Sequence, residues 1–167
     1  MEESKLIDYT DKMKKHLALL KKNINNSKYI GENIEHLNEI VKIFIWGEKN
    51  RQIFLDFFVK NDILNYFVIL ANKNIYHFQD KENSVKLIKY YSVLLVNLKT
   101  KESIDFVYSQ SDFNNFLKIE FDFEDEEIVF YFVNFAKGLS QRFNNFPFAF
   151  FYNEVSLKET QRLSYLL

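Results

Sequence analysis

The same pattern of apolar residues occurs twice in this chain, at a separation of about 50 residues. The segment Phe57–Leu70, FFVKNDILNYFVIL, aligns with Phe106–Ile119, FVYSQSDFNNFLKI. A helical apolar stripe precedes each segment, at Leu37, Ile40, Val41, Phe44 and Ile45, and again at Leu87, Tyr90, Tyr91, Leu94 and Leu95. Each unit predicts a long helix, a short helix, a polar break and a further helix, and such units bury their apolar faces only by stacking. We therefore expect an all-α fold, an armadillo/HEAT-like α-solenoid of about three helical repeats, with a compact orthogonal helical bundle as the competing architecture.

A third unit begins within residues 119–154. Asp122 is the predicted N-cap of its long helix, with Asp125 three residues later as in a capping box. Acidic residues in the first turn suit the helix dipole, and an apolar stripe follows at Ile128, Tyr131 or Phe132, Phe135 and Leu139. The run 146–152, FPFAFFY, is compatible with a buried strand, but the repeat and the position of Pro147 favour a helix.

The other elements follow from helical spacing and from polar breaks. Residues 1–27 form an amphipathic N-terminal helix with its stripe at Leu6, Tyr9, Met13, Leu17, Leu20 and Ile24. A solvated lysine face explains its basic side better than a membrane surface does, because acidic residues dilute the positive charge.

A second helix runs from about Tyr29 to Trp46, and Gly47 is expected to end it in a left-handed conformation. Residues 72–83 are polar and predict a loop that tucks Tyr76 and Phe78 onto the core.

Composition narrows the class of protein further. Nineteen Phe and 10 Tyr against 3 Gly and 1 Pro oppose disorder and a turn-rich β fold. A net charge of −1 gives no general reason to expect nucleic acid as a partner, and membrane association is expected to be indirect. The absence of cysteine removes thiolate chemistry and the commonest zinc ligand, and indicates a reducing, intracellular setting. No run of apolar residues reaches the roughly 20 that a membrane helix needs.

The sequence predicts no catalytic, cofactor or metal site. The three histidines, His16, His36 and His77, fall in different elements, and none has a second ligand at metal spacing. The acidic run Glu124–Glu127 is explained by helix capping better than by catalysis. Trp46 lies beside Gly47 at a helix end, where a tryptophan either covers the core or anchors an interface.

The chain carries a series of short motifs: Ile45-Trp46-Gly47, Asp56-Phe57-Phe58, Phe121-Asp122-Phe123 with Asp125-Glu126-Glu127-Ile128, Asn144-Asn145, and Phe151-Tyr152-Asn153-Glu154. In order and spacing these motifs resemble those of the FPL-domain proteins, whose animal members are labelled C-type lectin domain family 16. The resemblance covers residues 28–154, so the chain is predicted to be one domain, 1–167, with a divergent tail at 155–167. It implies an armadillo-like helical domain near the N-terminus of large cytosolic proteins that regulate endosomal and lysosomal trafficking and autophagy, including mitophagy. The candidate interaction residues among the matching ones are Trp46, Gly47, Phe57, Phe58, Asp122, Asp125, Glu126, Glu127, Asn144, Asn145, Phe151, Tyr152, Asn153 and Glu154.

The function that the resemblance implies is a non-catalytic scaffold for protein partners, cytoplasmic and peripheral on endosomal or lysosomal membranes. A structural accessory subunit of a large assembly, such as an organellar one, is the alternative. Ubiquitin transfer by the chain itself is disfavoured, because no cysteine is present for a thioester and no RING-type ligand set exists.

Overall fold

The computed structural model describes the backbone of residues 3–48, 52–77 and 79–142, and side chains within 5–138 of these ranges. These residues contain helices and no strand, which confirms the all-α prediction for the described part. The elements are α1 Glu3–Asn23, a 3-10 turn Ser27–Tyr29, α2 Ile30–Gly47, α3 Gln52–Lys60, α4 Ile63–His77, α5 Lys81–Asn97, α6 Lys101–Ser109, α7 Ser111–Leu117 and α8 Glu126–Arg142.

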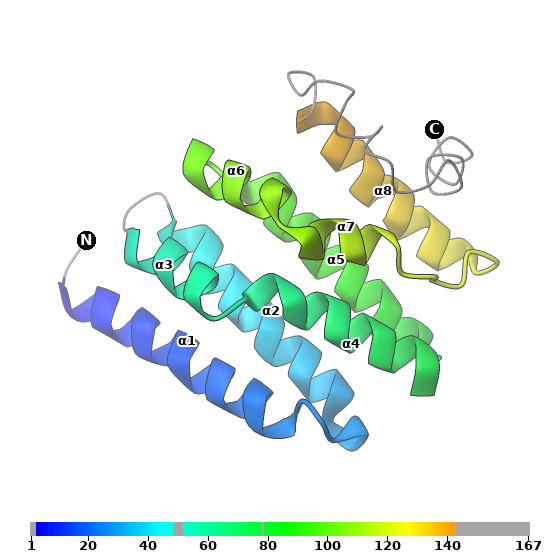
Figure 1. Cartoon of the computed structure of the whole chain (residues 1–167), viewed down its shortest axis with the longest axis horizontal. Helices are drawn as coiled ribbons and strands as arrows, with labels where there is room; N and C mark the ends of the chain where they lie inside the picture. Colours follow the sequence, from blue (N-terminus) through cyan, green and yellow to red (C-terminus); the bar gives the residue numbers. More distant parts are fainter. Residues whose placement is uncertain (1–2, 49–51, 78, 143–167) are drawn as a thin grey trace.

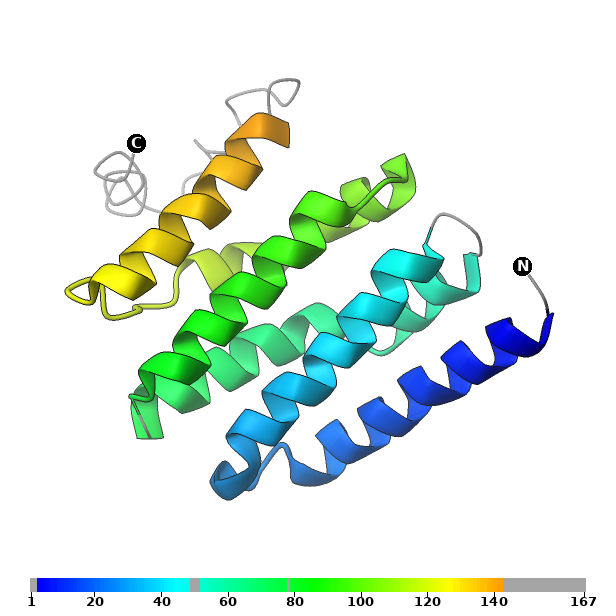
Figure 2. The same cartoon turned by 180° about the vertical axis from the view of Figure 1, so that it is seen from behind.

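The long helices α2, α5 and α8 lie side by side in chain order and run in the same direction (Figure 2). Helix α1 packs beside α2 at one edge of this row. The shorter helices α3, α4, α6 and α7 form a second layer on the other side (Figure 1). The order of one long helix and two further helices therefore occurs as α2–α3–α4 and again as α5–α6–α7, at the spacing that the sequence predicts.

The core lies between the two layers and is rich in aromatic rings. Tyr91 of α5 is its centre: its ring centroid lies 4.7 Å from that of Phe67, 4.4 Å from that of Phe116 and 6.0 Å from that of Phe135. These rings come from α4, α5, α7 and α8, so one cluster holds both layers and both units together. The predicted apolar stripes of the first, second and last helices face this core. Met13, Leu37 and Phe132, one from each stripe, are all buried.

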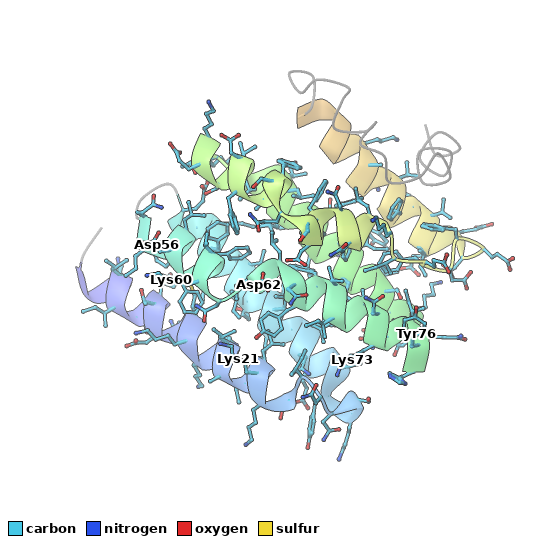
Figure 3. All side chains as sticks on the ribbon, viewed as in Figure 1. Lys21, Asp56, Lys60, Asp62, Lys73 and Tyr76 are labelled. Carbon is cyan, nitrogen blue, oxygen red and sulfur yellow. The ribbon has the colours of Figure 1, made fainter. Side chains whose placement is uncertain are left out.

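Polar contacts attach the C-terminal end of α1 to the second layer. The Lys73 ammonium donates to the Ile24 carbonyl oxygen at 2.7 Å, and Lys21 donates to the Asn61 side chain at 3.4 Å. Figure 3 labels Lys21 and Lys73, which lie along the junction of α1 with α3 and α4. Helix α1 is therefore attached to both layers.

The predicted loop at residues 72–83 is wrong, because α4 continues to His77 and α5 begins at Lys81. Asn74 is fully buried in α4, where its amide donates to the Asp80 carbonyl at 2.7 Å and to Ser84 Oγ at 2.9 Å. Asp80 then caps α5 by accepting from the Asn83 N–H. Tertiary hydrogen bonds satisfy the polar side chains that suggested a loop, and Tyr76 is 78% exposed instead of packing on the core.

Some predictions lie outside the described residues. These are the helix at 146–152, the tail at 155–167, the side chain of Leu139 and the motif residues Asn144, Asn145, Phe151, Tyr152, Asn153 and Glu154. Within the part of the chain that the structure does describe, no helix combines the length and the apolar character needed to span a bilayer.

Candidate interaction site around Trp46

Three aromatic rings from three helices meet at the C-terminal end of α2. The Trp46 ring lies 4.2 Å from the Tyr9 ring of α1 and 6.2 Å, edge to face, from the Phe54 ring of α3. We call Tyr9, Trp46 and Phe54 the aromatic stack. Trp46 is 40% exposed while Phe54 is 1% exposed, so the tryptophan covers the core with one side and faces solvent with the other. A partly exposed tryptophan on a rigid support is typical of interface anchors.

Gly47 allows this arrangement by its size and not by a left-handed backbone. The structure assigns it to the last turn of α2, and no described glycine has a positive φ, so the predicted left-handed stop is wrong. A Cβ atom at Gly47 would lie no more than 2.6 Å from three carbons of the Phe54 ring. Any larger residue would displace Phe54, which in turn supports Trp46.

The two phenylalanines of the α3 motif support the site from below. Phe58 is fully buried and stacks on Phe44 of α2, with the ring centroids 4.2 Å apart. Phe57 is partly buried against the same core. The pair fixes α3 on α2, and thereby positions Phe54 against Gly47.

The next residue, Glu48, joins the first unit to the second. It is 6% exposed, and its carboxylate accepts from the Lys99 N–H at 2.6 Å and from the Thr100 hydroxyl at 2.7 Å. Thr100 is the N-cap of α6, so the carboxylate of Glu48 lies at the positive end of that helix. Sequence reasoning missed this contact, because nothing in the sequence relates positions 51 residues apart.

The pKa of Glu48 decides how this contact responds to acid. Burial by itself raises the pKa, but hydrogen bonds from Thr100, Ser103 and Lys99 outweigh burial and hold the pKa of Glu48 below its ordinary value. Because the folded-state pKa is depressed, the stabilisation is present at neutral pH and is lost as the pH falls through that lowered pKa.

Glu48→Gln is therefore expected to lower the free energy of unfolding by roughly 1–2 kcal/mol at pH 7, because an ionised acceptor is lost. In urea melts the difference from the wild type should shrink as the pH falls below the ordinary glutamate pKa of about 4.3. Glu39→Gln is the matched control, since Glu39 lies on α2, which ends next to Glu48, and pairs with Lys42 at the surface. An equal effect of both substitutions would contradict the assignment.

The acidic start of the last helix differs from the prediction. Asp125, not Asp122, is the N-cap of α8: its carboxylate accepts from the N–H groups of Glu127 at 2.9 Å and Ile128 at 3.2 Å. Asp122 lies one turn earlier and accepts from the Glu124 N–H at 3.1 Å. Lys81 of α5 pairs with Asp125 and with Glu127, each at 3.0 Å. The hydrogen bond from Lys81 is the largest cause that lowers the pKa of Asp125.

We expect Asp125→Ala to lower the free energy of unfolding by about 1 kcal/mol through the lost cap. Asp122→Ala should cost less, because its hydrogen bond belongs to an exposed turn outside the helix. Thermal melts of the two variants check which loss of stability is larger. A larger loss for Asp122→Ala would mean that Asp122, and not Asp125, caps the helix.

The three histidines lie in three different helices, as predicted, but two of them meet in space. His16 of α1 and His36 of α2 face each other, with their Nδ1 atoms 3.1 Å apart, whereas His77 lies at the end of α4. Burial, and next the nearby His36, lower the pKa of His16. Sequence spacing cannot reveal such a pair, because the two residues lie 20 positions apart on different helices.

The remaining polar groups near these helices pair with one another. Lys86 of α5 bridges Glu35 at 3.2 Å and Glu82 at 2.9 Å, and Tyr90 donates to Glu35 at 3.2 Å. Asp112 lies near Asp62, and burial followed by the charge of Asp62 raises the pKa of Asp112. In the described ranges no three potential ligands gather at a metal-binding distance. The aromatic stack holds a partly exposed tryptophan ring against two neighbouring rings, and it is the candidate site considered below.

Comparison with known proteins identifies similar chains. The FPL family, described as "Uncharacterised conserved protein", matches residues 37–163. Protein CLEC16A of Homo sapiens is 33% identical over 122 residues, which are 72% of this chain and 11% of that protein. The CLEC16A homolog of Caenorhabditis elegans is 30% identical over 79% of this chain and 14% of its own length. Protein TRANSPARENT TESTA 9 of Arabidopsis thaliana is 27% identical over 66% of this chain and 13% of its own length. The chain thus matches less than a sixth of each of these relatives, and no solved structure is significantly similar to it.

Proposed function

The chain belongs to the FPL family, and we propose that it is a non-catalytic scaffold that binds protein partners in endosomal and lysosomal trafficking and autophagy. Its site of action in this proposal is the cytoplasm, with indirect attachment to endosomal or lysosomal membranes. The family relationship is the observation that carries the proposal. The pathway comes from what the resemblance to FPL-domain proteins implies.

The proposed architecture is an armadillo/HEAT-like α-solenoid of about three repeats. Its support is the row of α2, α5 and α8 together with the recurring order of long and short helices. Stacked units of this kind present long continuous surfaces to partners. This suits a protein whose work is binding.

The aromatic stack is the proposed contact point. Trp46 offers a large apolar surface that is already held in place by Tyr9 and Phe54, so little side-chain freedom is lost on binding. Gly47 and Phe58 take part as support, since both are buried.

Co-precipitation of tagged chain from its own cells tests the proposal. The wild type should recover trafficking or autophagy components, and Trp46→Ala should reduce their recovery by at least about tenfold, as expected for an interface anchor. Tyr76→Ala is the matched control, because Tyr76 is an exposed aromatic on α4. Thermal melts verify that both variants fold.

Three outcomes would each contradict a part of the proposal. If the wild type recovers no such component and endosomes stay normal after deletion of the gene, the chain does not act in endosomal trafficking or autophagy. Comigration of the chain with a stable megadalton complex in size-exclusion chromatography would favour the structural accessory subunit instead. Equal recovery of these components by Trp46→Ala and the wild type would show that Trp46 is not the contact point, without contradicting the role in trafficking or autophagy.

A further inference from the structure

His16 and His36 form a contact between α1 and α2 that the proposed function does not use. Their Nδ1 atoms lie 3.1 Å apart and their ring centroids 5.2 Å apart, and both rings are partly buried. The two nitrogens therefore point into one small space between the helices.

One proton at most can occupy that space between the two nitrogens. A neutral imidazole carries its hydrogen on one nitrogen and accepts on the other, so one ring donates from Nδ1 and the other accepts. When the donating ring carries its hydrogen on Nε2 instead, the Nδ1 lone pairs of both neutral rings face the same space and can bind a single cation.

A metal ion fits this geometry after a small adjustment. Nitrogen ligands of a tetrahedral ion lie about 2.0–2.1 Å from the metal, which places two of them about 3.3 Å from each other. The observed separation of 3.1 Å is only a few tenths of an ångström shorter. Rotation of the two rings is enough to supply the difference.

Charged residues on both helices act on the pair. Glu39 follows His36 by one turn of α2 and acts electrostatically on His16, while its carboxylate accepts from Lys42 at 2.7 Å. Lys15 is the cation that acts on His16 from α1. Because the described residues hold no preformed set of three ligands, two imidazoles would carry most of the affinity, with water or Glu39 completing the coordination.

We propose that His16 and His36 form a two-histidine site for a transition-metal ion that favours imidazole, such as Zn²⁺, Ni²⁺ or Cu²⁺. The ion would link α1 to α2. Helix α1 also carries Tyr9 of the aromatic stack, so the bound ion would hold that ring more firmly against Trp46. The site does not depend on the identity of any protein partner.

Calorimetric titration of the full, chelator-treated chain with ZnCl₂, NiCl₂ and CuCl₂ tests the site. The wild type should bind one ion per chain and melt at a higher temperature when the metal is present. His16→Gln and His36→Gln should each weaken binding by at least about tenfold, since each removes one of the two nitrogens. His77→Gln is the matched control and should bind like the wild type, because His77 lies on α4 outside the pair.

Binding that is unchanged in both His16→Gln and His36→Gln would overturn the proposal, as would the absence of binding by the wild type at millimolar metal. Loss of binding in His77→Gln with retention in the other two would assign the ion elsewhere and would also overturn it. Melts without metal verify that each variant is folded, so a loss of affinity is not read from an unfolded chain.

Discussion

Replacing Phe135 by alanine is expected to lower the free energy of unfolding by about 3–5 kcal/mol, because it leaves a cavity where three helices meet. The side chain is 1% exposed, and its ring centroid lies 6.0 Å from that of Tyr91, 6.0 Å from that of Phe116 and 5.7 Å from that of Phe132. These neighbours belong to α5, α7 and α8, so they cannot all close in on the vacated space. Urea denaturation followed by circular dichroism measures the loss.

Phe130→Ala on the same helix is the matched control for Phe135→Ala. Phe130 is 61% exposed, so its removal should change the free energy of unfolding by no more than about 0.5 kcal/mol. Similar losses for the two substitutions would mean that α8 does not present the described face to the core.

Gly47→Ala is expected to destabilise the chain by an amount near the upper end of roughly 1–3 kcal/mol, because its methyl group would overlap the Phe54 ring. Alanine is the better helix former by about 1 kcal/mol, which offsets part of this cost. Phe54 cannot move freely, since it is buried and lies against Trp46. Thermal and urea melts measure the net effect.

Gly31→Ala is the matched control, at the other end of α2. A Cβ atom there would lie 3.6 Å from the Asn83 side chain, which is an ordinary contact, so the higher helix propensity of alanine should stabilise the chain. The two substitutions are thus predicted to have opposite signs. Stabilisation by both would show that Phe54 can leave Gly47 at little cost.

The helices with strong periodicity could be predicted from the sequence alone. The stripes of α1, α2 and α8 follow the 3.6-residue period because one face of each helix packs on a neighbour. The recurrence at about 50 residues likewise anticipated the order of long and short helices in the two units. The Trp46 ring packs on Tyr9 and Phe54, which agrees with the prediction that it covers the core, whereas its role as an interface anchor stays a prediction.

The errors arise where particular side-chain contacts, which the helical period does not specify, decide the structure. Asn74 looks like a loop residue until Asp80 and Ser84 accept its hydrogen bonds. Asp122 and Asp125 both satisfy the composition of a cap, and only the backbone geometry selects Asp125. Gly47 fits a helix stop by type, but the neighbouring ring of Phe54 explains it. The pairing of His16 with His36 depends on how α1 rotates against α2, which periodicity does not specify.

The contact of Glu48 with α6 also bears on how such a chain can grow by gene duplication. Glu48 follows directly after α2, and the residue that follows directly after α5 is Leu98, which is 1% exposed. A tandem copy of the second unit would place a leucine where the next short helix needs a carboxylate. The two units are therefore not interchangeable. Each added unit would need another residue to accept hydrogen bonds from the N–H groups at the start of its short helix.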